Sequence, residues 1–133
     1  DDNSFDTILG SHVFEHVRNI VPLVEDLCRI LRAGGHLISI TPYGSSDDAW
    51  SSPHHVHYFD ENTWAYFSRR LYEQDFDSSG RGAMQCGNYG DWVIVETRLV
   101  PYREFLNDSE LEFKKRHFRN IIQEIHVVLR KES

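Results

Sequence analysis

The sequence predicts an α/β fold built on parallel strands, and three stretches carry this prediction. The run "FDTILG", Phe5–Gly10, is apolar and β-branched, as in a strand that is buried on both faces. Over Asn19–Arg32 the apolar residues follow the i, i+3, i+4, i+7 spacing of one helical face. The run "HLISITPY", His36–Tyr43, is a second apolar strand candidate. Strand, helix and strand in this order form a βαβ unit, whose crossover is right-handed and whose strands are parallel.

Three residues mark the ends of the predicted helix. Pro22 falls in the first turn, where a missing N–H costs little. Gly34 and Gly35 follow the last apolar position and predict a left-handed stop, because glycine adopts a positive φ without steric strain. We therefore expect the helix to end at the glycine pair.

A long loop and a second helix are expected next. The loop "GSSDDAWSSPHHVHY", 44–58, has about fifteen residues, longer than most connections, so we expect it to be functional or mobile. Asp60 can cap a helix that begins near Glu61, and Phe59 and Trp64 fall at the positions of a hydrophobic staple. The expected buried stripe of this helix consists of Trp64, Phe67 and Leu71.

Two antiparallel strands and a long helix are expected in the rest of the chain. A weak strand falls within Phe76–Cys86 and a strong one is "DWVIVETRLV", 91–100, with the glycine-rich "CGNYG" between them as a turn. Ser109 and Glu112 form a capping box for a helix that reaches Lys131. Its basic residues fit either a solvated face or a subunit-contact helix. Its apolar stripe consists of Phe118, Ile121, Ile122, Ile125, Val128 and Leu129.

The composition is that of an ordinary folded protein. A chain of 133 residues fits one domain, and the formal net charge of −7 argues against a general nucleic-acid binder. No apolar run is long enough to span a bilayer and no signal peptide is visible, while two cysteines, Cys28 and Cys86, are too few for a disulfide framework. We therefore expect a cytoplasmic protein. Met84 is the only methionine, so we expect that Asp1 is not a translation start.

A series of short motifs lies on the predicted βαβ unit. They are Phe5-Asp6, Glu15-His16, Arg29, Leu31, Gly34-Gly35 and Thr41-Pro42. This series resembles the second half of a class I S-adenosylmethionine-dependent methyltransferase domain: an "FD-apolar" strand, "EH", a helix ending in "R-x-L-x-x-G-G", and a strand ending in "T-P". "HHVHYFDENTW", 54–64, also resembles the family's loop after this strand. The resemblance is specific over Ser4–Leu71 and topological only over Phe76–Tyr102.

The resemblance implies a partial Rossmann-like sheet, whose strands correspond to the family's strands 4-5-7-6, with flanking helices and a long C-terminal helix. Residues 1–102 would be the C-terminal half of the domain and residues 103–133 a helical extension. The family's glycine-rich cofactor loop is absent from the sequence, together with roughly two βαβ units of about thirty residues each. The strand Phe5–Leu9, central in the family, would then be an exposed edge. We expect a homo-oligomer that forms through this strand or through the C-terminal helix.

The resemblance also implies S-adenosylmethionine as cofactor and a small-molecule methyl acceptor, in a chain that is inactive alone. His12 could act as a general base, since histidine titrates near neutrality, and His55 and His57 are further catalytic candidates. The residues implied in cofactor binding are Ser11, His12, Glu15 and His16. The residues implied in a substrate loop are Tyr43, Trp50, His54 and Tyr58.

Two other functions stay open at this point. The chain could be a non-catalytic methyltransferase-like module that is retained for assembly, with Glu15 and His16 only capping or orienting the next helix. It could instead bind a metal, because His55 and His57 share one face of an extended segment. Their partners would be Asp47, Asp48 or Glu15. Since the histidine loop lacks a cysteine pair and a helical H-x-x-x-H motif, we assign no metal ligand from the sequence.

Overall fold

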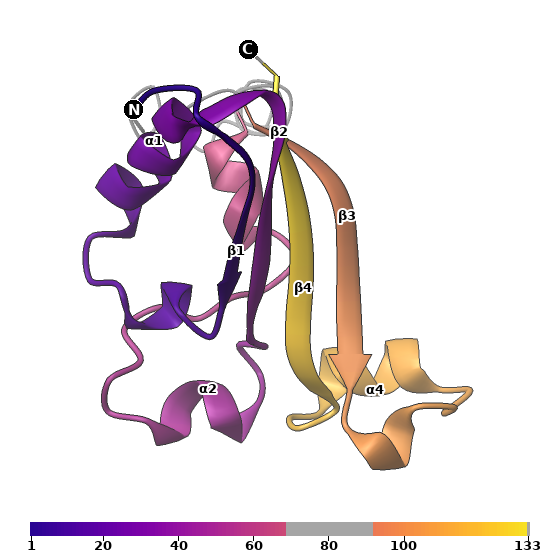
Figure 1. The fold of residues 1–133 in the computed structure, drawn as a ribbon. Coiled ribbons are helices and arrows are strands. Elements are labelled where there is room, and N and C mark those ends of the chain that lie inside the picture. Colours follow the sequence, from indigo (N-terminus) through magenta and orange to yellow (C-terminus); the bar gives the residue numbers. More distant parts are fainter. Residues whose placement is uncertain (69–91, 133) are drawn as a thin grey trace, which may run out of the picture.

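A computed structural model of the chain describes residues 1–68 and 92–132. They form one sheet of four strands in the spatial order β1-β2-β4-β3 (Figure 1). β1 and β2 are parallel, and β4 runs antiparallel to both β2 and β3. The α/β fold and the strand order implied by the resemblance, 4-5-7-6, are confirmed. The strands are β1 (Phe5–Ser11), β2 (Leu31–Pro42), β3 (Trp92–Pro101) and β4 (Ile122–Lys131).

Short helices flank the sheet. The longest described helix, α1 (Ile20–Ile30), connects β1 to β2 and packs beside them, while α2 lies at the end of the sheet where β1 and β2 finish (Figure 1). In the described ranges, no helix is long and apolar enough to cross a membrane. The other helices are η1 (Phe14–His16), α2 (Asp47–Ser51), η2 (Thr63–Phe67), η4 (Arg103–Phe105) and α4 (Leu111–His117).

The predicted βαβ unit is present, but its helix ends before the glycine pair. α1 ends at Ile30 and β2 begins at the next residue, so both glycines lie inside the strand. Gly34 has a φ of 79°, and the register between β1 and β2 shifts between Phe5 and Thr7. We attribute this irregularity to the positive φ of Gly34, which only glycine adopts without strain. The glycine pair therefore shapes β2 and does not stop the helix.

The long C-terminal helix predicted over Ser109–Lys131 is wrong. Helix α4 covers only Leu111–His117, Asn120 has a φ of 59°, and β4 begins at Ile122. Asn120 interrupts any helix here, because a left-handed residue cannot continue a right-handed helix. The β-branched residues that follow suit a strand that pairs on both sides. The residues predicted as a helical extension thus supply a central strand, in which the buried side chains alternate at Ile125, Val127 and Leu129.

The helix predicted near Glu61 is the short 3₁₀ helix η2. Asp60 does act at its start: Oδ1 accepts hydrogen bonds from the backbone N–H of Asn62 at 2.9 Å and of Thr63 at 3.0 Å. Phe59 and Trp64, the expected staple pair, stack with their ring centroids 5.7 Å apart. The local signals at this helix start were therefore correct, although the helix is shorter than expected.

The strong strand predicted at 91–100 is β3, which pairs with β4. Its expected partner within Phe76–Cys86 lies outside the described residues, as does Leu71. The core lies on the sheet face where β2 and β4 bring buried residues opposite one another. These pairs are Leu37 with Leu129, Ser39 with Val127, and Thr41 with Ile125.

β1 forms an edge of the sheet, as expected. Among the described strands it pairs only with β2, and the side chains of Phe5 and Leu9 are 50% and 61% exposed. Such an edge presents unpaired backbone groups and apolar surface to another chain. The C-terminal helix that was expected as a second contact surface does not form.

Candidate functional site

The carboxyl ends of β1 and β2 meet at the same end of the sheet, which is where open α/β sheets bind their ligands. β1 leads through Ser11 and His12 into η1, and β2 leads through Tyr43 into the loop with α2 (Figure 1). The two connections are joined by the backbone N–H of Val56, which donates to the carbonyl oxygen of Glu15 at 2.7 Å. The turn after one strand therefore positions the loop after the other.

Gly10 makes the turn after β1 possible. A Cβ at this position would lie 2.3 Å from Cε2 and 2.5 Å from Cζ of Phe14, whose side chain is buried. Replacing Gly10 by alanine is therefore expected to lower the free energy of unfolding by about 1 to 3 kcal/mol, the usual cost of an overpacked core. Urea denaturation measures this loss. In a Phe14→Leu background the same substitution should cost less, and equal costs in both backgrounds would exclude the ring as the cause.

His12 stands at the end of β1 in an unusual backbone conformation. Its φ is 54°, in the left-handed region that costs a non-glycine residue about 1 to 2 kcal/mol. The backbone N–H donates to the carbonyl oxygen of Ile40 at 2.8 Å, which ties the turn to β2. The imidazole lies between two carboxylates: Nε2 is 2.7 Å from Oε2 of Glu124, and Nδ1 is 3.5 Å from Oε1 of Glu15. Backbone strain of this kind concentrates at functional sites.

Glu124 is a site residue that the sequence analysis missed. In β4 it pairs with Pro42, so that it lies beside the carboxyl end of β2. The missed signal is the alternation of polar residues, Glu124 and His126, with buried apolar ones. That alternation indicates a strand with a functional face, but it is informative only when the segment is recognised as a strand.

Glu15 carries a buried carboxylate. The residue is 1% exposed, and neither side-chain oxygen has a hydrogen-bond partner among the described residues. Oε1 lies 3.5 Å from Nδ1 of His12 and 3.8 Å from Nε2 of His16, at the limit of hydrogen-bond distance or beyond it. Burying an unpaired carboxylate is strongly unfavourable, so a cation at this position would offset the free energy of desolvating the charge.

His55 reaches the same place from the loop. Its Nδ1 lies 2.9 Å from the carbonyl oxygen of Ala49; since a carbonyl only accepts, Nδ1 carries a proton, and in the neutral ring Nε2 holds the lone pair. The rings of His16 and His55 meet edge to face, with their centroids 4.6 Å apart. One ligand atom each from Glu15, His16 and His55 lie within 4.8 Å of one another.

The neighbouring loop residues lie outside this cluster. Nε2 of His57 lies 3.2 Å from the carbonyl oxygen of Arg18, and His54 is exposed. Trp50 and Tyr58 form an exposed stack, with ring centroids 3.7 Å apart and planes at 10°. The structure thus brings His12, Glu15, His16 and His55 together, and leaves His57 apart from them.

Tyr43 faces a carboxylate that the sequence analysis did not single out. Its hydroxyl donates to Oε2 of Glu61 at 2.7 Å, and burial together with this hydrogen bond raises the pKa of Tyr43 well above its ordinary value. Burial alone would raise the pKa of Glu61, but the hydrogen bonds from Tyr43 and Lys115 outweigh it, and this pKa is lowered. Nζ of Lys115 lies 3.2 Å from Glu61 and 3.3 Å from Glu112.

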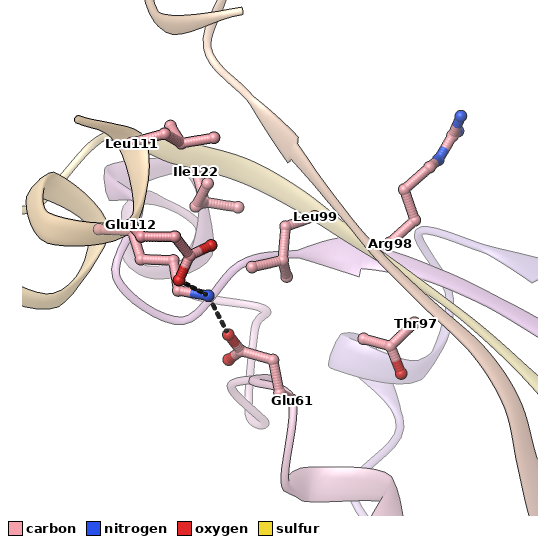
Figure 2. Close-up of a pocket in the computed structure, with 8 residues that line it drawn as sticks. Glu61, Thr97, Arg98, Leu99, Leu111, Glu112 and Ile122 are labelled. Atoms are coloured by element: carbon pink, nitrogen blue, oxygen red, sulfur yellow. Dashed lines mark ion pairs between the residues drawn. The ribbon is translucent and has the colours of Figure 1, made fainter. Parts of the chain in front are cut away.

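A cleft of about 520 Å³ opens beside this ion-pair group (Figure 2). No residue predicted for catalysis or cofactor binding lines it. Glu61 and Glu112 both pair with Lys115, so these three charges have partners within the cleft. We therefore place the candidate site at the strand ends. The cleft is lined by Glu61, Thr97, Arg98, Leu99, Leu111, Glu112, Lys115 and Ile122.

Residues 1–39 match the family model of a methyltransferase domain. The search of curated proteins gives no match. The fold is similar to solved structures of S-adenosylmethionine-dependent methyltransferases from Archaeoglobus fulgidus, with a TM-score of 0.58 at 12% identity, and from Mesorhizobium loti, with a TM-score of 0.54 at 14% identity. The [4+2]-cyclase SpnF is also similar, with a TM-score of 0.50 at 14% identity.

These structural matches cover 98% of this chain, but only 61%, 63% and 52% of the three solved chains, respectively. At such identities the similarity shows a shared fold. The inclusion of a cyclase illustrates that chemistry must be argued from the site and not from the fold.

Proposed function

We propose that this chain is the part of a class I S-adenosylmethionine-dependent methyltransferase that binds the methyl acceptor. The match of its N-terminal residues and the order of its strands support this family. The observation that carries the proposal is the agreement of two independent features. Residues 1–39, which span β1, α1 and most of β2, match the methyltransferase domain. The β1-β2-β4-β3 sheet follows the 4-5-7-6 order that the sequence motifs imply.

The residues present fit one end of the proposed cofactor. Ser11 and His12 are exposed at the end of β1, where the methionine end of S-adenosylmethionine and a small-molecule acceptor would meet. S-adenosylmethionine supplies the transferable methyl group when it is bound. We assign to His12 the removal of a proton from the acceptor, with Glu124 fixing its ring, and to His55 a position beside the acceptor. The chain alone would be inactive, because the glycine-rich cofactor loop is absent from its sequence.

A second candidate function is favoured by the open edge. Phe5 and Leu9 expose apolar surface along β1, as in a strand that is completed by another chain. A non-catalytic module that assembles through β1 would also account for this surface. Such a module has no use for the strained turn at His12, and for that reason we rank it second.

The test is an NMR titration of the chain with S-adenosylhomocysteine. We expect the amide signals of residues 11–16 to shift at millimolar ligand concentrations. The free energy of unfolding should not rise by the about 2.7 kcal/mol that a ligand at a hundred times its dissociation constant gives a protein with a complete site. Adenosine is the control: it lacks the homocysteine end and should leave these signals unchanged. Signals that stay unchanged with both ligands would contradict the proposal, and a dimer found by sedimentation in that case would favour the assembly module.

A further inference from the structure

We propose that Glu15, His16 and His55 form a binding site for a first-row transition-metal dication at the carboxyl end of β1. One ligand atom from each residue lies within 4.8 Å of the other two. The sequence alone predicts no metal ligand, and the histidine pair that shares one face of an extended segment, His55 with His57, is not the pair in this cluster. The cation site requires only the described residues and does not depend on methyl transfer.

The buried carboxylate of Glu15 is the strongest argument for a cation. Both of its oxygens are buried and lack a hydrogen-bond partner among the described residues. The nearest cluster nitrogen, Nε2 of His16, is 3.8 Å from Oε1. This distance is too long for a hydrogen bond, but a metal ion between the two atoms would contact both. A tetrahedral zinc ion holds two such ligands about 3.4 Å apart, from metal–ligand distances of about 2.0 to 2.2 Å.

The protonation of His55 fits a metal ligand. Nδ1 donates to the carbonyl oxygen of Ala49 at 2.9 Å, which leaves the Nε2 lone pair available. Histidine ligands of metals commonly donate their second N–H to a backbone carbonyl, which fixes both the tautomer and the ring orientation. Ala49 is buried in α2, so this support is rigid. The backbone N–H of Val56 also holds the histidine loop on Glu15, at 2.7 Å from its carbonyl oxygen.

The donor set indicates which cations fit. Two imidazoles and one carboxylate suit Zn²⁺, Mn²⁺, Fe²⁺ or Co²⁺, whereas Mg²⁺ and Ca²⁺ prefer oxygen ligands alone. Three protein ligands leave coordination positions open, and the side chain of His16 is 43% exposed, which gives an entry path. The idea that an oxygen of the methyl acceptor takes one of these open positions rests on the proposed function. The binding of the cation itself does not depend on that function.

The experiment is a titration of the metal-free chain with Co²⁺ and Zn²⁺. We expect one Co²⁺ per chain with visible absorption bands, its displacement by Zn²⁺, and no displacement by Mg²⁺ at the same concentration. Zn²⁺ should also raise the melting temperature of the wild type. Glu15→Gln, His16→Ala and His55→Ala should each weaken binding by about tenfold or more.

Two matched variants keep the test decisive. His57→Ala removes a histidine two residues from His55 in the same loop, but outside the cluster, and should bind Co²⁺ like the wild type. Glu15→Gln removes a buried charge while keeping the shape, so the metal-free variant should be at least as stable as the wild type and should gain nothing from Zn²⁺. The proposal would be overturned if the chain did not bind Co²⁺ stoichiometrically. It would also be overturned if His57→Ala lowered the Co²⁺ affinity as much as His55→Ala does. Since the readouts use the cation alone, they are separate from the titration with S-adenosylhomocysteine.

Discussion

Replacing Trp64 by alanine is expected to lower the free energy of unfolding by about 3 to 5 kcal/mol, the range for a buried tryptophan or phenylalanine that leaves a cavity. Trp64 is 1% exposed and makes ring contacts with three other buried aromatic residues. The centroid distances are 5.4 Å to Phe14, 5.7 Å to Phe59 and 5.5 Å to Phe67. The loss is measured by urea denaturation followed by tryptophan fluorescence and circular dichroism.

The effect of Trp64→Ala should extend to the candidate site. Phe14 is the first residue of η1 and precedes Glu15, and its ring rests edge-on against Trp64. Without that support η1 is expected to loosen and Co²⁺ binding to weaken, although Trp64 touches no proposed ligand. The combination of lost stability and lost binding would show that the aromatic cluster positions the site.

Two variants control for this interpretation. Trp64→Phe keeps an aromatic ring and removes a buried indole N–H that has no acceptor among the described residues, so it should cost less than alanine. Trp50→Ala removes an exposed ring that stacks on Tyr58, which is worth only about 0.5 to 1.5 kcal/mol. If Trp64→Ala lowered the free energy of unfolding no more than Trp50→Ala, the rings around Trp64 would not be a main source of stability.

The βαβ unit could be predicted because each of its signals is local. Period and β-branching identify β1, α1 and β2 without any knowledge of the rest of the chain. The strand order came from the resemblance, since nothing in residues 122–131 alone says which strands they would pair with. The position of the site could also be predicted, because it lies at the carboxyl ends of the two parallel strands β1 and β2.

The nature of β4 could not be predicted from its own residues. Its apolar residues fit a helical stripe as well as an alternating strand, and the capping box at Ser109 and Glu112 favoured the helix. The deciding factors are the left-handed Asn120 and the two strands, β2 and β3, that bond to β4 on either side. Such pairing is a tertiary effect that overrides local preference. Glu124 was missed for the same reason, because its place beside His12 depends on the β4 register.

The role of each loop histidine also needed the structure. His54, His55 and His57 are equivalent in the sequence, apart from the face that alternate residues share. The backbone bonds of Val56 and His57 to Glu15 turn the segment, so that only His55 of the three joins the cluster at Glu15. A turn of this kind depends on contacts between residues about forty positions apart in the chain.

In the proposed methyltransferase, replacing His12 by asparagine is expected to lower kcat for methyl transfer by about 10² to 10⁴, the usual contribution of a general base, and to leave KM nearly unchanged. The reason is the geometry of the ring. The carboxylate of Glu124, 2.7 Å from Nε2, favours the tautomer that carries its proton there. Nδ1, which lies 3.5 Å from Oε1 of Glu15, then holds the lone pair that can accept a proton. Because the chain alone is proposed to be inactive, the measurement is steady-state kinetics of the chain joined to the cofactor-binding half that the proposed function requires.

Glu124→Gln separates the base from the residue that positions it. An amide can still accept the Nε2–H bond but does not stabilise the charged ring, so kcat should fall by less than with His12→Asn. The control is His36→Asn, since His36 lies on β2 and pairs with Arg130, away from the strand end. A His12→Asn variant with unchanged kcat would exclude proton removal by this residue. Among the described residues, the proposed cation site at Glu15 would then be a candidate for acceptor activation, because a bound dication lowers the pKa of a coordinated oxygen without any base.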